Sequence, residues 1–249
     1  MRFKISSDIV SDLMMIILME PMYVGSLAVT EGLRKDGSEE LPPGCSLIVL
    51  KVLDRTGKWQ ERRCFYRLFR WILENKRYYG IRVVNISVGT TCRRAEDHRV
   101  LIAGVEQLWD AGLVVVAAAG NQGPKAGSVT APGSSRKIIT VGSSDLLTGR
   151  TAISGRGPTF ECVCKPDLVA PGNHVLACAP GADNGYGVKS GTSMSTPLVA
   201  GAAALMLEKN PELTNVQIKM KLKESARDMG LPKNQQGWGE LDLERFMEL

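Results

Sequence analysis

Apolar runs of strand length alternate with helical stretches from residue 46 onward. Residues 46–53 form a nearly continuous run of branched apolar side chains, which is typical of a strand buried on both faces of a parallel sheet. Further strands are predicted at residues 82–87, 113–119 and 137–141. These runs predict a sheet whose strands are separated by longer connections.

Helical patterns fill the intervals between these strands and follow the last of them. Residues 60–79 place apolar side chains on one stripe that arginines and lysines surround, as in an amphipathic helix. The other predicted helices are 95–111, 192–209 and 215–228. The glycine- and proline-rich stretches 120–135 and 154–185 predict connecting loops.

This alternation predicts a three-layer α/β fold, in which a mostly parallel sheet carries helices on both faces. Ligands of such sheets bind beyond the carboxyl ends of the strands. No internal repeat or linker interrupts the pattern, and 249 residues are enough for one domain with a large core.

Composition narrows the class of protein. With 44% hydrophobic and 23% charged residues, the chain is neither disordered nor a coiled coil. A net charge of +5 is too small to indicate a nucleic-acid partner, and none is expected. The basic side chains of 60–79 fit a solvated helix face better than an anionic docking face. Cys162 and Cys164 form a C-x-C pair without a second pair or a nearby histidine, so we expect no metal site.

The N-terminal segment contains a short apolar run at residues 13–19. Asp8 and Asp12 precede this run, no signal-peptide cleavage site follows it, and it is too short to span a bilayer. We therefore expect no membrane partner and a cytoplasmic location, with secretion left open.

The stretch Gly-Thr-Ser-Met-Ser-Thr-Pro at residues 191–197 places small residues and hydroxyls directly before an alanine-rich helix. Ser193 is expected at the helix N-terminus, where unpaired N–H groups and the helix dipole favour negative charge. Pro197 is expected in the first turn, where proline is tolerated. The plain alternative is that Thr192 or Ser193 only caps the helix.

Two further stretches accompany this one: Ala-Ala-Gly-Asn-Gln-Gly-Pro at 118–124 and Lys-Pro-Asp-Leu-Val-Ala-Pro-Gly at 165–172. Together, and in this order, they resemble the subtilases, the subtilisin-like serine proteases. The resemblance runs from residue 25 to the C-terminus and implies a subtilisin-like catalytic domain over 25–249. Residues 1–24 do not match the family, and because no place in the sheet is evident for them, they are a candidate for disorder.

The resemblance implies roles for individual residues. Ser193 corresponds to the nucleophile, and Asn121 corresponds to the side-chain donor of the oxyanion hole, working with the backbone N–H of Ser193. For Asn121 the alternative is a plain turn residue. The residues implied in substrate binding are Ser87, Val88 and Gly89, as an edge that pairs with an extended peptide, together with Ala118, Ala119, Gly120 and Thr192. Thr90 stands where many relatives carry glycine, which leaves the size of the S1 pocket open.

A catalytic serine needs a base, and the base needs an acid to orient it. Subtilases carry these on Asp-Ser/Thr-Gly and His-Gly-Thr-His motifs, and neither motif is present. The two histidines, His98 and His174, lie at positions that the family does not use for catalysis, so we expect surface or capping roles. We hypothesise that the chain derives from an active protease and lacks two triad members, through a truncated or frame-shifted start or through decay.

Three interpretations follow. The first is a serine endopeptidase that is incomplete or impaired, acting on peptides or proteins in extended conformation. The second is an inactive pseudoprotease that binds peptides along residues 87–89 or regulates a partner protease. The third is a structural α/β domain with coincidental motifs. No cofactor is expected; calcium enters only by family analogy, and the sequence assigns no site to it.

Overall fold

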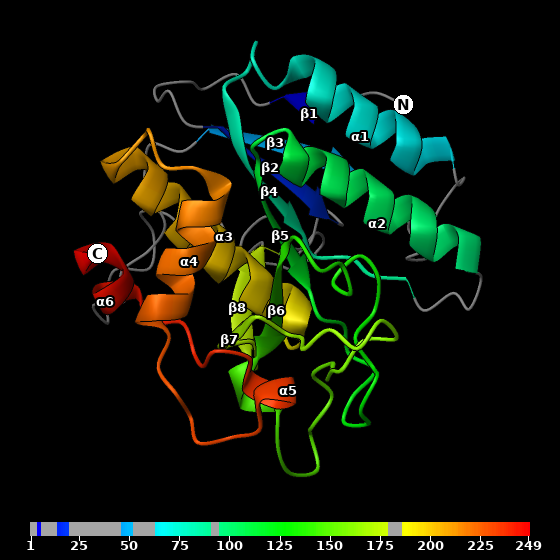
Figure 1. Ribbon diagram of the computed structural model, residues 1–249, viewed down its shortest axis with the longest axis vertical. Coiled ribbons are helices and arrows are strands. Elements are labelled where there is room, and N and C mark those ends of the chain that lie inside the picture. Colours follow the sequence, from blue (N-terminus) through cyan, green and yellow to red (C-terminus); the bar gives the residue numbers. More distant parts are fainter. Residues whose placement is uncertain (1–3, 6–13, 20–45, 52–62, 91–94, 179–185) are drawn as a thin grey trace.

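A parallel sheet flanked by helices organises the chain, as the computed structural model shows (Figure 1). The structure describes residues 4–5, 14–19, 46–51, 63–90, 95–178 and 186–249. In these residues seven strands form one sheet, in the order β1-β3-β2-β4-β5-β6-β7. The strands are β1 (Lys4–Ile5), β2 (Met14–Met19), β3 (Ser46–Lys51), β4 (Ile81–Ile86), β5 (Val114–Ala118), β6 (Ile139–Ser143) and β7 (Leu168–Ala170). All pair in parallel except β1, which is antiparallel to β3.

A separate antiparallel hairpin and several helices complete the described part of the chain. The hairpin pairs β8 (Val175–Cys178) with β9 (Tyr186–Lys189). The helices are α1 (Arg63–Asn75), α2 (Ala95–Asp110), the 3-10 helix η2 (Ser144–Leu146), α3 (Thr192–Lys209), α4 (Asn215–Ser225), α5 (Lys233–Gln236) and α6 (Leu243–Glu248). Helices α1 and α2 cover one face of the sheet and α3 covers the other, so the predicted three-layer α/β fold is confirmed.

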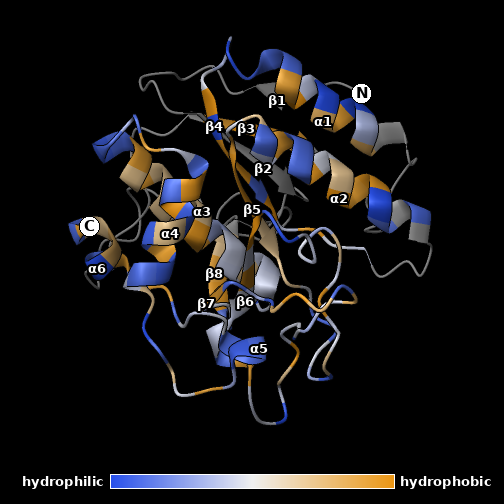
Figure 2. Ribbon diagram, viewed as in Figure 1, coloured by the Kyte–Doolittle hydropathy of each residue, from blue (hydrophilic) through white to orange (hydrophobic). Residues whose placement is uncertain are grey.

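The core is densest where α3 crosses the sheet. Every residue of β5 is buried, and β5 lies between β4 and β6. Helix α3 packs against β4, β5, β6 and β7 through a buried row of small residues that includes Ala200, Gly201 and Ala204. Small side chains allow the helix to approach the sheet closely, and burial of this apolar surface is the main stabilising contribution. Figure 2 shows the apolar strands at the centre and polar colouring on the outer faces of α1 and α2.

Most predicted elements are present with shifted ends. The strand predicted at 137–141 begins two residues later, at Ile139, where its pairing with Val116 of β5 starts. The carbonyl groups of Lys137 and Ile138 accept hydrogen bonds from Lys219. The prediction that residues 154–185 are entirely loop is wrong, since β7 and β8 lie in this stretch. Strand β7 has only three residues, with a proline on either side, and its identity depends on pairing with β6.

Two further expectations, on the N-terminal segment and on Pro197, also need correction. The described parts of the N-terminal segment belong to the sheet, because β2 pairs in parallel with both β3 and β4, and β1 pairs with β3. The expectation that these residues have no place in the sheet is therefore wrong.

Pro197 is the sixth residue of α3, one turn deeper than expected. Proline has no N–H, so the backbone hydrogen bond that another residue there would donate to the carbonyl group of Ser193 is absent. Among the described residues, no helix is both long and apolar enough to cross a bilayer.

Helices α1 and α2 pack closely because Gly104 in α2 faces the ring of Phe69 in α1. A Cβ atom at Gly104 would lie 2.1 Å from Cδ2 of Phe69, a distance that side chains do not tolerate. Both residues are buried, and the Phe69 side chain is only 3% exposed. The missing side chain at Gly104 thus allows the two helices to meet.

We predict that Gly104→Ala lowers the free energy of unfolding by up to about 2 kcal/mol. Overpacking costs about 1–3 kcal/mol, and the better helix propensity of alanine offsets about 1 kcal/mol of this cost. Urea denaturation measures the difference. Shortening the neighbour in Phe69→Leu should make the same glycine substitution less costly, whereas a Gly104→Ala variant more stable than the wild type would contradict the packing described.

Candidate active site

Three segments meet at the carboxyl ends of the parallel strands. Ser87 follows β4, Asn121 lies three residues after the end of β5, and Ser193 is the second residue of α3. Since β4 and β5 run in parallel, both segments leave the sheet at the same edge, where α3 begins. The structure therefore brings together residues that are more than one hundred positions apart in the sequence.

Ser193 faces the segment after β4. Its Oγ donates a hydrogen bond to the carbonyl oxygen of Ser87 at 2.7 Å, and the side chain is half-buried. The N-cap of α3 is Gly191, with no side-chain capping bond, so the alternative that Thr192 or Ser193 only caps the helix is wrong. Gly191 has a φ of 143° that favours glycine, and a Cβ there would lie 2.8 Å from Nδ2 of Asn121.

Thr192 ties the loop after β5 to the start of α3. Oδ1 of Asn121 accepts hydrogen bonds from the backbone N–H of Thr192 at 2.9 Å and from its hydroxyl at 3.0 Å. The Thr192 hydroxyl in turn accepts from the backbone N–H of Gly120 at 3.1 Å. Because Oδ1 of Asn121 takes up these bonds, its NH₂ group is the part that can donate to a ligand.

The remaining residues implied in substrate binding line the same edge with their backbone. Ser87 and Val88 are buried and Gly89 is exposed, and no backbone hydrogen bond is found for Val88 or Gly89 within the described residues. These residues follow β4 without belonging to a strand, so the expected edge continues the chain beyond the end of β4. On the opposite side Ala118 and Ala119 are buried, Gly120 is half-buried, and the side chain of Thr192 is fully buried.

Neither histidine bonds to Ser193. His98 is the fourth residue of α2 and is half-buried. His174 is exposed in a turn with a φ of 56°, and its backbone N–H donates to the hydroxyl of Ser190. The hydrogen bond of the Ser193 hydroxyl goes to a peptide carbonyl and not to an imidazole.

Metal ligands do not gather in the described part of the chain. No group of three or more histidine, cysteine, aspartate or glutamate side chains there could hold a metal ion. Cys162 and Cys164 are free and exposed on the turn before β7.

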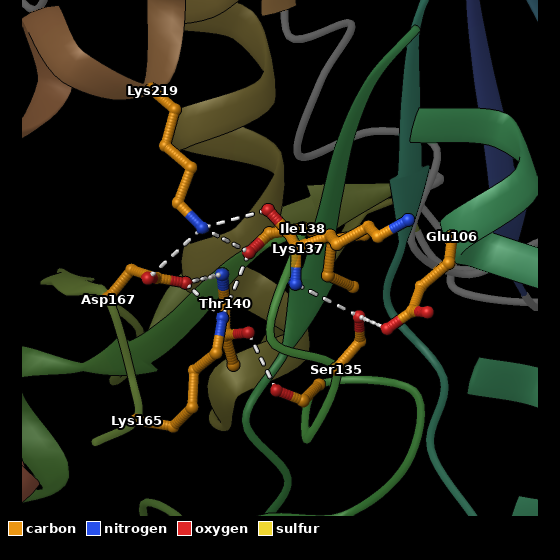
Figure 3. Close-up of polar contacts among 9 residues, drawn as sticks. Glu106, Ser135, Lys137, Ile138, Thr140, Lys165, Asp167 and Lys219 are labelled. Atoms are coloured by element: carbon orange, nitrogen blue, oxygen red, sulfur yellow. Dashed lines mark hydrogen bonds and ion pairs between the residues drawn. The ribbon is translucent and has the colours of Figure 1, made fainter. Parts of the chain in front are cut away.

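A buried ion cluster anchors β7, which leads to the site. Nζ of Lys165 lies 2.5 Å from Oδ2 of Asp167, and the two side chains are 1% and 8% exposed (Figure 3). Asp167 also accepts the backbone N–H of Thr140 at 2.7 Å, and Lys219 lies 3.4 Å from its other oxygen. Lys219 further lies over the rings of Trp109 and Trp238. This cluster joins the starts of β6 and β7 to α4.

The cluster is linked to Ser193 through the backbone. Strand β7 ends just before Gly172, whose carbonyl oxygen accepts the N–H of Gly191 at 2.8 Å. A Cβ at Gly172 would lie 2.2 Å from Oγ of Ser195, so only glycine fits between β7 and the first turn of α3.

Burial away from water lowers the pKa of Lys165 to about 8, although the carboxylate of Asp167 opposes this shift.

Comparison with known proteins identifies the family. The profile of the subtilase family matches residues 36–239. This chain belongs to the subtilase family. The resemblance found in the sequence motifs is thereby confirmed.

Curated relatives of this subtilase are proteases. Serine protease AprX of Bacillus subtilis (strain 168) is 35% identical over 205 residues, which cover 73% of this chain and 46% of AprX. Subtilisin Savinase of Lederbergia lenta is 36% identical over 188 residues, which cover 76% of this chain and 63% of Savinase. The chain thus spans about half the length of AprX and less than two thirds of Savinase.

Solved structures support the fold of this subtilase. Sphericase superposes with a TM-score of 0.76 at 21% identity, covering 93% of this chain and 91% of that structure. The prenylagaramide maturation protease PagA superposes with a TM-score of 0.74 at 21% identity, covering 95% and 93%. At this level of identity the likeness establishes the architecture.

Sequence reasoning missed several residues that shape the site. Lys165 and Asp167 lie in a motif that served only to support the family resemblance. Their contact with Lys219 of α4 was missed because no local sequence pattern relates these residues. Thr130 lies in a predicted loop, yet it contacts both glycines that flank the site. Its role depends on tertiary packing that the sequence pattern does not reveal.

The lowered pKa of Lys165 predicts a pH-dependent stability. Between about pH 8 and its ordinary value of 10.5, the unfolded chain holds a proton that the folded chain has released. Stability contributed by this group therefore rises with pH in that window, by up to about 1.4 kcal/mol per pH unit. We expect the free energy of unfolding of the wild type, relative to Lys165→Met, to increase from pH 8 to pH 10 in urea titrations.

Lys223→Met, at an exposed position of α4, is the matched control for this comparison, and its difference from the wild type should stay flat. A Lys165→Met difference that is also flat, or that falls with pH, would show that Lys165 is not held in a desolvated site.

Proposed function

We propose that this subtilase domain binds extended peptides along Ser87–Gly89 and presents Ser193 to a peptide carbonyl. The observation that carries the proposal is the 2.7 Å hydrogen bond from Ser193 Oγ to the Ser87 carbonyl oxygen. It places the hydroxyl beside Val88 and Gly89, whose backbone groups have no backbone partner among the described residues. An extended peptide can pair with such an edge by main-chain hydrogen bonds. An N–H group of the bound peptide would then donate to the Ser87 carbonyl in place of the Ser193 hydroxyl, and a carbonyl of the peptide would face Ser193.

The surroundings of Ser193 favour negative charge on that carbonyl oxygen. The backbone N–H of Ser193 lies in the first turn of α3, where N–H groups have no partner within the helix. The NH₂ group of Asn121 is oriented by the two bonds that Thr192 donates to Oδ1. We propose these two donors as the oxyanion hole, with Ser193 as the nucleophile of peptide-bond hydrolysis.

Proton transfer is the step that the described residues do not supply. A serine hydroxyl becomes a good nucleophile only when a base takes its proton, and an amide carbonyl such as that of Ser87 is too weak a base. Neither His98 nor His174 bonds to the hydroxyl. We therefore propose that this chain hydrolyses peptides at a negligible rate.

The second candidate is a pseudoprotease that binds peptides without cutting them. The same observation favours it. Because the Ser193 hydroxyl donates to a carbonyl and not to a base, nucleophilic attack stays slow, while the binding edge at residues 87–89 is still present. This candidate differs from an impaired enzyme only in its biological use of the bound peptide.

A fluorophosphonate probe tests the proposal directly, since it labels only activated serines. We expect less than a few per cent labelling of the purified chain under conditions in which Savinase is labelled completely. Ser193→Ala is the control for site-specific reaction. Stoichiometric labelling that Ser193→Ala abolishes would contradict the proposed impairment and support an active enzyme.

A further inference from the structure

The turn before β7 carries two cysteines close together. Cys162 and Cys164 are free and exposed, and Val163 alone separates them. Two residues of chain span at most about 7 Å, and the Cα atoms of a disulfide usually lie about 4.4–6.8 Å apart. The spacing therefore keeps the two thiols within reach of a common bond.

Backbone hydrogen bonds hold this turn in one shape. The N–H of Gly157 donates to the carbonyl oxygen of Lys165 at 2.8 Å, across the base of the turn. The N–H of Thr159 donates to the carbonyl oxygen of Val163 at 2.9 Å, and the N–H of Val163 donates to Oγ1 of Thr159 at 3.2 Å. The N–H of Cys162 donates to the carbonyl oxygen of Thr159 at 2.9 Å. The two cysteines thus belong to one closed turn.

The two thiols lie on the outer side of this turn. Exposure alternates along the stretch, because Cys162 and Cys164 are exposed while Val163 is half-buried and Lys165 is buried. Successive side chains of an extended segment point to opposite sides, so residues on either side of Val163 share one side. Lys165 is directed inward to Asp167, which leaves Cys164 toward solvent.

We propose that Cys162 and Cys164 form a reversible disulfide by exchange with low-molecular-weight disulfides, independently of peptide binding at Ser193. In the first step the thiolate of one cysteine attacks a sulfur of the oxidant, whose S–S bond breaks and releases one thiolate. In the second step the thiolate of the other cysteine attacks the protein sulfur of this mixed disulfide and releases the second thiolate. The cysteines are oxidised, the oxidant is reduced to two thiols, and the two cysteine protons end on those thiols.

Exposure and ring size make this bond a reversible modification and not a structural staple. Thiolate attack requires access, which both cysteines have, and exposed disulfides are the ones that reducing thiols reopen. A disulfide stabilises a fold mainly by restricting the unfolded chain, and this effect is smallest for short loops. A loop that contains one intervening residue therefore adds little to the stability of the fold.

Peptide mapping of the oxidised full chain tests the proposal. The protein is incubated with oxidised glutathione and a metal chelator at about pH 8, near the ordinary pKa of a thiol. Remaining thiols are blocked with N-ethylmaleimide, and digestion with trypsin and Asp-N releases residues 157–166, which contain no other cysteine. We expect this peptide to carry no N-ethylmaleimide and to be lighter than the dithiol peptide by two hydrogen atoms. Excess reduced glutathione should restore both N-ethylmaleimide adducts.

Two single variants provide the matched controls. Cys162→Ser and Cys164→Ser should each stop at the mixed disulfide with glutathione, because the second thiol is absent. In the wild type, unmodified thiols, a persistent mixed disulfide or a peptide joined to a second molecule would each overturn the proposal. A disulfide that excess reduced glutathione leaves intact would overturn it too, because the bond would then be structural.

Discussion

The hydrogen bonds between Thr192 and the loop after β5 are the constraint on which the site depends. Thr192 donates twice to Asn121 and accepts from Gly120, so the first residue of α3 and the end of β5 are fixed relative to each other. Without this link, Ser193 would be set only by the helix and Asn121 only by its loop. With it, the start of α3, which carries Ser193, and the loop that carries Asn121 are held together.

Close backbone approach is the condition for this link. Gly191 lies against Asn121, and Gly172 lies against Ser195, so a side chain at either glycine would separate α3 from the loops it meets. The buried Lys165–Asp167 pair fixes the start of β7, which delivers Gly172 to that position. A buried ion pair adds little net free energy, because the cost of desolvation offsets much of the attraction between the charges. Its main effect here is to fix the position of the start of β7. The arrangement of Ser193 therefore depends on contacts well beyond the site.

The sequence predicts the layers of this fold, but not all of its strands or the contacts between distant segments. Long apolar runs such as Val114–Ala118 identify their strands because burial on both faces leaves no polar alternation. The three-residue strand β7 and the N-terminal strands were missed or misjudged, because their stability comes from partners elsewhere in the chain. In the site, Ser193 and Asn121 were proposed from motifs that resemble those of the subtilases, and the structure brings both to the start of α3. Thr130 and Lys165 were not recognised, because their contacts join segments that no local pattern relates.

A double-mutant cycle between Asn121 and Thr192 tests the central link most directly. Asn121→Ala, Thr192→Val and the double variant are compared by urea denaturation, and the coupling energy is the departure from additivity. If the two side chains hold each other as described, the coupling is about 1 kcal/mol, as for a typical intramolecular hydrogen bond. A coupling close to zero, with each single variant folded, would show that α3 and the loop after β5 are positioned independently and would contradict the account.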